Sequence, residues 1–387
     1  ISSATGNVTL GAVSATQGNL TLNAGNTLGN ITIGALKGDI VSVDLGGVLG
    51  TINTGNKVEI TSNEVTYVGS EISKNVVEIT AAAGGTDLNA QVIGGAAADD
   101  ALTIIGKGDT QTITASGDLS GGTLTLTLTE ATKLSSLDIS GVKGLSAATA
   151  IDLKNVSVEN KLIVDIQGSD AAETITANST SATLTAITLS GDLGGGANTV
   201  TVAPDAAAVA ITTIDLSGLS ATGGTLSGTI THNAAQIALT TIKGSAGNDT
   251  ITIGIANADL TVTGGAGNDV FNVTAAKTTV GGGEHTTITD FSAGDSIKFA
   301  ASVTAYKHST VDLSGKADLK SAIAAVLTDS DEATTVYGFT YNNESYLYYN
   351  VATATATAAA NDVLVKLTGT TVDLDSLTVT NNDIVFA

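Results

Sequence analysis

Two nine-residue segments constrain the fold of this chain more than any other feature of its sequence. They are Gly244–Thr252 (GSAGNDTIT) and Gly264–Asn272 (GGAGNDVFN). Both fit the repeat G-G-x-G-x-D-x-U-x, in which U is a large apolar residue, except that Ser245 replaces one glycine. Glycines in such repeats form tight turns, and U (here Ile251 or Phe271) points into a core. The pair therefore predicts a coiled parallel sheet whose turns stack along one edge.

The oxygen-rich turns of these segments suit calcium, which takes six to eight oxygen ligands from carboxylates and carbonyls. Asp249 and Asp269 are 20 residues apart, close to the roughly 18 residues that two nonapeptides contribute to one coil. We therefore expect one ion between these two turns, and one to three ions along this edge. The candidate ligands are Gly244, Ala246, Asn248, Asp249, Gly265, Gly267, Asn268 and Asp269.

In the next coil Thr286 takes the place of the aspartate, and Glu284 or Asp290 is the candidate for the missing carboxylate. The alternative is that all these segments are metal-free turns, since Asn and Asp favour tight turns by themselves. Two matched copies near coil spacing favour calcium. Degenerate copies at residues 95–103, 168–176 and 193–201 are interpreted as turns only.

The N-terminal part of the chain contains a second, looser repeat. Gly6–Leu10, Gly18–Leu22 and Gly29–Ile33 share the pattern Gly-Asn-apolar-Thr-apolar, which is typical of a turn followed by a short strand. Units of this size bury no core alone, so they are expected to stack. Antiparallel hairpins in a sandwich are the alternative. We interpret residues 1–240 as irregular solenoid coils and residues 241–295 as a calcium-binding β-roll.

After residue 295 the composition changes, and six of the seven tyrosines lie here. Helical spacing of apolar residues predicts one helix over 318–327, with Ser314 or Asp318 near its start. The segments 336–341 and 346–349 predict a β-hairpin across residues 342–345. Short strands are expected near 363–367, 377–379 and 384–386. Residues 296–387 are thus predicted to cap the solenoid, and the whole chain is predicted to be all-β apart from this one helix.

Composition excludes several classes of function. The 37 acidic and 15 basic side chains give a net charge of −22, which disfavours binding to nucleic acid. An apolar fraction of 42 % disfavours disorder. No apolar run is long enough for a membrane helix. Cysteine is absent, and the three histidines form no metalloprotease motif. We therefore expect no enzyme, and because Met is absent we expect a part of a larger protein.

The two nonapeptides, the segment Ile288–Ile297 (ITDFSAGDSI) and the C-terminal hairpin resemble RTX proteins. Within that group, the Thr-, Ala- and Gly-rich coils without cysteine most resemble S-layer proteins of Gram-negative bacteria. The resemblance implies export by a type I (ABC) secretion system that reads an uncleaved C-terminal signal. It also implies folding in external Ca²⁺, self-assembly into a lattice on the cell surface, and an N-terminal domain, absent from this chain, that binds lipopolysaccharide. The alternative is an RTX adhesin that binds host or neighbouring cells.

Overall fold

The computed structural model describes residues 8–15, 18–24, 31–45, 58–69, 75–94, 100–156, 159–179, 181–233, 235–254, 260–273, 285–300, 302–351, 362–368 and 372–386. The chain divides into two compact units. Unit 1 consists of Ile1–Ala177, Leu189–Val200 and Leu219–Thr225, and unit 2 consists of Asn178–Thr188, Thr201–Gly218 and Leu226–Ala387. In the described residues, the fold is all-β with about ten turns of parallel β-solenoid and one α-helix. This confirms the predicted fold class at that level.

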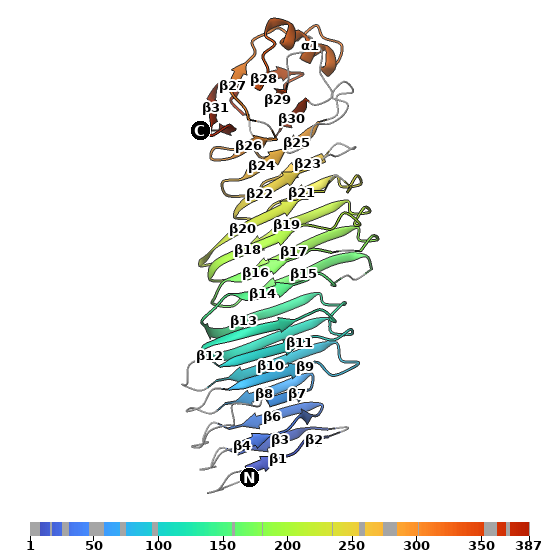
Figure 1. Cartoon of the computed structure of the whole chain (residues 1–387), viewed down its shortest axis with the longest axis vertical. Helices are drawn as coiled ribbons and strands as arrows, with labels where there is room; N and C mark the ends of the chain where they lie inside the picture. Colours follow the sequence, from blue (N-terminus) through green and yellow to red (C-terminus); the bar gives the residue numbers. More distant parts are fainter. Residues whose placement is uncertain are drawn as a thin grey trace. The chain divides into compact units, whose positions relative to one another are not determined.

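Unit 1 is a stack of short strands that pair in parallel with strands one coil further along the chain (Figure 1). Its strands are β1 (Val8–Leu10), β2 (Val13–Ser14), β3 (Leu20–Asn23), β4 (Ile31–Ile33), β5 (Leu36–Lys37), β6 (Ile40–Asp44), β7 (Val58–Thr61), β8 (Glu64–Val68), β9 (Val76–Thr80), β10 (Asp87–Ile93), β11 (Ala101–Ile105), β12 (Thr112–Thr127), β13 (Ser136–Leu145), β14 (Thr149–Asp152), β15 (Lys161–Gln167) and β16 (Glu173–Thr176). Parallel pairing of β1 with β4 rules out the antiparallel sandwich for these repeats.

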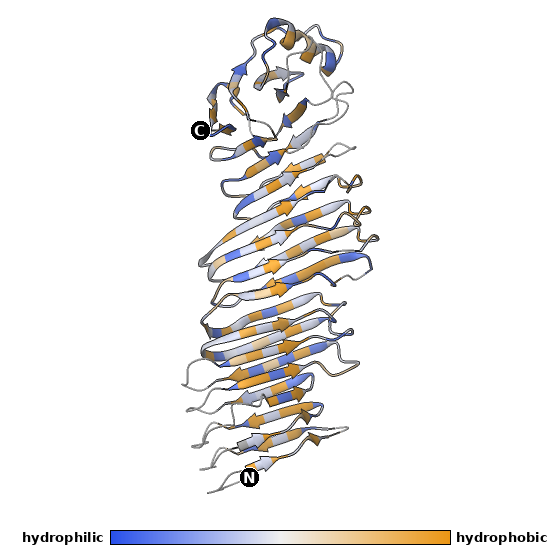
Figure 2. Cartoon of the chain, viewed as in Figure 1, coloured by the Kyte–Doolittle hydropathy of each residue, from blue (hydrophilic) through white to orange (hydrophobic). Residues whose placement is uncertain are grey.

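Columns of apolar side chains run through the coils of unit 1. Val41 pairs in register with Val65, Val65 with Ala90, and Ala90 with Ala115. All four side chains are buried. Along most of the strands buried residues alternate with more exposed ones, as in β10, and Figure 2 shows the corresponding alternation of hydropathy. Burial of the inward-facing side chains, about every second residue of a strand, provides the hydrophobic stabilisation of the coils.

Unit 2 continues the same architecture with its own parallel pairs. Four strands have residues in both units: β17 (Ala186–Asp192), β18 (Gly196–Val202), β19 (Thr213–Ser220) and β20 (Gly224–Thr231). The remaining elements are β21 (Thr241–Lys243), β22 (Asn248–Ile253), β23 (Leu260–Thr263), β24 (Val270–Val273), β25 (Thr286–Ile288), β26 (Ser296–Phe299), β27 (Ala305–His308), α1 (Leu319–Asp329), β28 (Thr335–Tyr341), β29 (Glu344–Asn350), β30 (Val363–Leu367), a 3₁₀ turn (Leu374–Ser376), β31 (Leu377–Thr380) and β32 (Asp383–Phe386).

The predicted helix and hairpin are both present in unit 2. Helix α1 begins after Asp318, whose carboxylate accepts the Ser321 N–H at 2.7 Å, as expected of an N-cap. The hairpin β28–β29 turns at Asn342 and Asn343, both with positive φ. The buried face of α1 packs against Tyr337 and its apolar neighbours on this sheet. No helix in the described part of the chain is long and apolar enough to cross a membrane.

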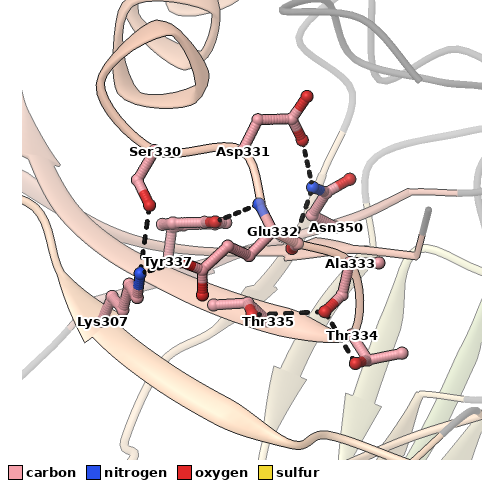
Figure 3. Close-up of polar contacts among 9 residues, drawn as sticks. All are labelled: Lys307, Ser330, Asp331, Glu332, Ala333, Thr334, Thr335, Tyr337 and Asn350. Carbon is pink, nitrogen blue, oxygen red and sulfur yellow. Dashed lines mark hydrogen bonds and ion pairs between the residues drawn. The ribbon is translucent and has the colours of Figure 1, made fainter. Parts of the chain in front are cut away.

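The C-terminal strands close the coil stack of unit 2. Strand β30 pairs in parallel with β25, and β32 pairs antiparallel with β26. The loop after α1 is held by polar contacts (Figure 3). Lys307 Nζ lies 2.6 Å from Glu332 Oε1, and the Glu332 N–H donates to the hydroxyl of the buried Tyr337 at 2.8 Å. The pairings of β30 with β25 and of β32 with β26 cover strand edges that the last coil would otherwise leave open, as a cap does.

Candidate metal centre

The two nonapeptides lie on adjacent coils of unit 2, one turn directly beside the other. Strand β22 pairs in parallel with β24, and Ile251 faces Phe271 across this pair. Both side chains are completely buried. The prediction that the U residues point into the core is therefore confirmed.

A column of three buried carboxylates follows from this register. Asp249 and Asp269 are each 1 % exposed, and Asp295 on the next coil is 2 % exposed. The Asp249 N–H donates to Asp269 Oδ1 at 2.8 Å, and the Asp269 N–H donates to Asp295 Oδ1 at 2.8 Å. Each carboxylate thus binds the backbone of the coil before it. We call Asp249, Asp269 and Asp295 the acidic column.

Turn residues supply further hydrogen bonds to the acidic column. The Ser245 N–H and hydroxyl both donate to Asp249, and the Ser292 N–H and hydroxyl donate to Asp295. Asp290 lies nearby, where its two oxygens accept the N–H groups of Gly264 and Gly265 at 2.8 Å each. The loss of glycine at position 245 therefore gives Asp249 a hydroxyl partner instead of disrupting the turn.

The remaining predicted ligands lie around the same turns. Gly244 is buried against the Gly264 carbonyl oxygen, and Gly267 lies against Asn248 Oδ1. Asn248 Oδ1 also accepts the Asn268 N–H at 2.8 Å, so the two asparagines form a second ladder beside the acidic column. Ala246 is exposed in its turn. All nine predicted residues thus belong to stacked turns of adjacent coils.

The sequence analysis did not predict that three residues would belong to the acidic column or bond to it: Asp295, Ser245 and Ser292. Asp295 precedes Ile297 by two residues, as Asp249 precedes Ile251, and this spacing was the available signal. Glu284, the other proposed carboxylate, lies outside the described residues, as do residues 281–283. Across the described part of the chain, no three His, Cys, Asp or Glu side chains gather as a preformed metal site.

Burial dominates the electrostatics of the acidic column. Burial is the main reason that the pKa of Asp269 is raised to about 7; the hydrogen bond from the Asp249 N–H opposes the rise, and the charges of Asp249, Asp295 and Asp290 add to it. Burial likewise raises the pKa of Asp249 and of Asp295. None of the ion pairs found among the described residues involves these three carboxylates. The column is therefore a group of buried carboxylates that no basic side chain of the described residues pairs with.

The backbone at Gly265 requires glycine for two reasons. Its φ is +108°, and a Cβ there would collide with the Ser245 carbonyl oxygen of the preceding coil. Gly223 also has positive φ (+88°), but nothing lies within 4 Å of the corresponding Cβ. We expect Gly265→Ala to lower the free energy of unfolding by more than Gly223→Ala, which should cost about 1–2 kcal/mol. Urea denaturation of both variants measures the difference, and equal losses would contradict close stacking of the turns.

Searches against protein-family models and against curated proteins find no match to this chain.

Proposed function

We propose that this chain belongs to a secreted structural protein that forms a calcium-dependent layer on a bacterial cell surface. The observation that carries the proposal is the acidic column, in which buried carboxylates of successive coils lie in register beside glycine turns. The surface layer and the type I export route in this proposal are inferred from the resemblance of the nonapeptides to RTX proteins. The proposed role is mechanical, with Ca²⁺ fixing the conformation of the coils.

The donor set of the acidic column fits calcium in kind. Carboxylates and main-chain carbonyls are hard oxygen ligands, which Ca²⁺ prefers and softer metals do not. The residues that would hold the ion are Asp249 and Asp269 with carbonyl groups of the adjoining turns, and Asp290, which binds the backbone of Gly264 and Gly265, is the third candidate. When bound, Ca²⁺ supplies the positive charge that the buried carboxylates lack in the described structure.

The same electrostatics explain why folding would depend on the compartment. Where free calcium is scarce, the charges of Asp249, Asp269 and Asp295 repel one another in a poorly solvated place, which weakens the stacking of these coils. Where calcium is abundant, binding to the folded form adds its free energy to folding. A chain that stays loose inside the cell and folds outside is compatible with export before folding.

Electron microscopy tests the proposed function. The purified chain is examined by negative staining in EDTA, in 10 mM MgCl₂ and in 10 mM CaCl₂. We expect ordered two-dimensional sheets in CaCl₂ alone, because the layer is proposed to require calcium. Dispersed particles that melt at a higher temperature in CaCl₂ would favour the adhesin. Dispersed particles with identical melting curves in all three solutions would overturn both functions.

A further inference from the structure

A second buried carboxylate without a cation lies in unit 1, in a degenerate nonapeptide that the sequence predicted to be only a turn. Glu173 begins β16 and has no exposed surface. Its Oε1 accepts the Ser169 N–H at 2.9 Å and the Ser169 hydroxyl at 2.5 Å. Its Oε2 is buried and has no hydrogen-bond partner among the described residues. One oxygen of this carboxylate is therefore hydrogen-bonded and the other is not.

A second unpartnered oxygen lies on the adjacent strand. Thr149 on β14 is the register partner of Glu173. Thr149 is fully buried, and its Oγ1 also lacks a hydrogen-bond partner within the described structure. On the other side of Glu173, Asn198 is 1 % exposed and accepts the Glu173 N–H through Oδ1 at 2.8 Å. The oxygens of Thr149, Glu173 and Asn198 thus belong to neighbouring positions on three successive coils.

A carbonyl oxygen borders the same space as Glu173 Oε2. A Cβ on Gly168 would collide with the Leu193 carbonyl oxygen and would lie 2.7 Å from Glu173 Oε2. Both oxygens therefore lie against the same side of Gly168 and close to each other. Two such acceptors repel each other unless a donor or a cation lies between them, because each carries negative charge.

Among the residues that the structure describes, no basic side chain forms an ion pair with Glu173. The ion pairs found among the described residues of unit 1 involve Lys107 and Lys133, and neither includes Glu173. Burial of a charged carboxylate without a compensating positive charge is unfavourable. The cluster therefore differs from an ordinary solvated turn.

We propose that Glu173 anchors a second cation site, in which Glu173 Oε2 and the Leu193 carbonyl oxygen are ligands and Thr149 Oγ1 completes the buried oxygen lining. The ligand class is a hard cation that prefers oxygen, for which Na⁺ and Ca²⁺ are the two sources. A single buried carboxylate balances the charge of Na⁺, whereas Ca²⁺ would also draw on the exposed Asp170. The site uses no residue of the acidic column and does not depend on the proposed function.

A proton is the competing occupant. Burial raises the pKa of Glu173, and a neutral carboxylic acid would donate its Oε2–H to the Leu193 carbonyl oxygen. Glu173→Gln distinguishes a bound cation from a bound proton, because the glutamine amide can donate the same hydrogen bond but has no charge to bind a cation.

Hydrogen exchange of residues 168–176 provides the test. The chain is dialysed into choline chloride with chelator, and NaCl or chelator-free CaCl₂ replaces the choline salt at equal ionic strength and pH 7. We expect NaCl or CaCl₂ to slow exchange of the Ser169 amide about 10-fold in the wild type, and to leave Glu173→Gln unchanged. Asp152→Asn, which removes an exposed carboxylate at the end of β14, should behave as the wild type.

The outcomes decide between the occupants. Slowing by NaCl identifies a monovalent site, and slowing by CaCl₂ alone identifies a divalent one. The local effect should persist in Asp269→Asn, because that variant leaves unit 1 intact. Equal exchange in all salts, or equal slowing in wild type and Glu173→Gln, would overturn the proposal. If Glu173→Gln does not fold, Thr149→Val must weaken the salt effect in its place, and an unchanged effect would count against the site.

Discussion

Asp269→Asn is expected to stabilise the calcium-free protein at pH 8 and to abolish its stabilisation by calcium. Asp269 has a pKa of about 7 in the folded protein against 3.8 ordinarily. An acid whose pKa rises on folding loses stability as pH rises through this window, so the wild type without calcium should lose about 4 kcal/mol between pH 4 and pH 8. Asparagine removes the charge and keeps an oxygen to accept the Asp249 N–H.

Calcium should reverse the order of stability of the wild type and Asp269→Asn. At about 100 times its Kd, one ion that binds only the folded state adds about 2.7 kcal/mol of stability. The wild type should gain this increment, whereas Asp269→Asn should not. Thermal and urea unfolding in EDTA and in CaCl₂ measure both effects. Asp205→Asn is the matched control, since it removes an exposed carboxylate of unit 2. If Asp269→Asn destabilises the calcium-free protein, the charge of Asp269 does not destabilise the fold as we expect.

Phe271→Ala is expected to cost about 3–5 kcal/mol of unfolding free energy, with or without calcium. Phe271 is completely buried, faces Ile251 and Ile297 on the adjoining coils, and meets the ring of Phe291 edge-on at a centroid distance of 6.2 Å. Truncation leaves a cavity that these rigid parallel strands cannot readily fill.

Urea denaturation with a matched neighbour tests this loss. Asn272→Ala changes the next residue of β24, whose side chain is only partly buried, and should shift the free energy by about 0.5 kcal/mol or less. Similar losses for the two variants would mean that the U position does not set the core of these coils.

The local features of the fold could be predicted because each depends on a short stretch of sequence. Asp318 before an apolar 3.6-residue period predicted α1, and Asn342–Asn343 between two alternating segments predicted the hairpin. The alternation of apolar and polar residues predicted strands with one buried face. Stacking of the N-terminal units followed from their number, since none of them can bury a core alone, but the choice between parallel coils and an antiparallel sandwich stayed open.

The contacts between coils could not be predicted in the same way, because they depend on register across 20 to 26 residues. Loops of different length separate the strands, so the sequence repeats the spacing of Asp249 and Ile251 at Asp295 and Ile297 but did not indicate the register by which Asp295 continues the column. Nor did it indicate that Ser245 bonds to Asp249, since a serine in place of glycine resembles simple degeneration. The contacts of Glu173 could not be predicted for the same reason, as they depend on its neighbours one coil away.

The most direct test of the central claim is an anomalous difference map from crystals of this chain grown in 10 mM CaCl₂. The account predicts a calcium peak between the turns that contain Asp249 and Asp269, with ligand oxygens at about 2.3–2.6 Å. An ordered acidic column with no anomalous peak beside either aspartate would contradict it.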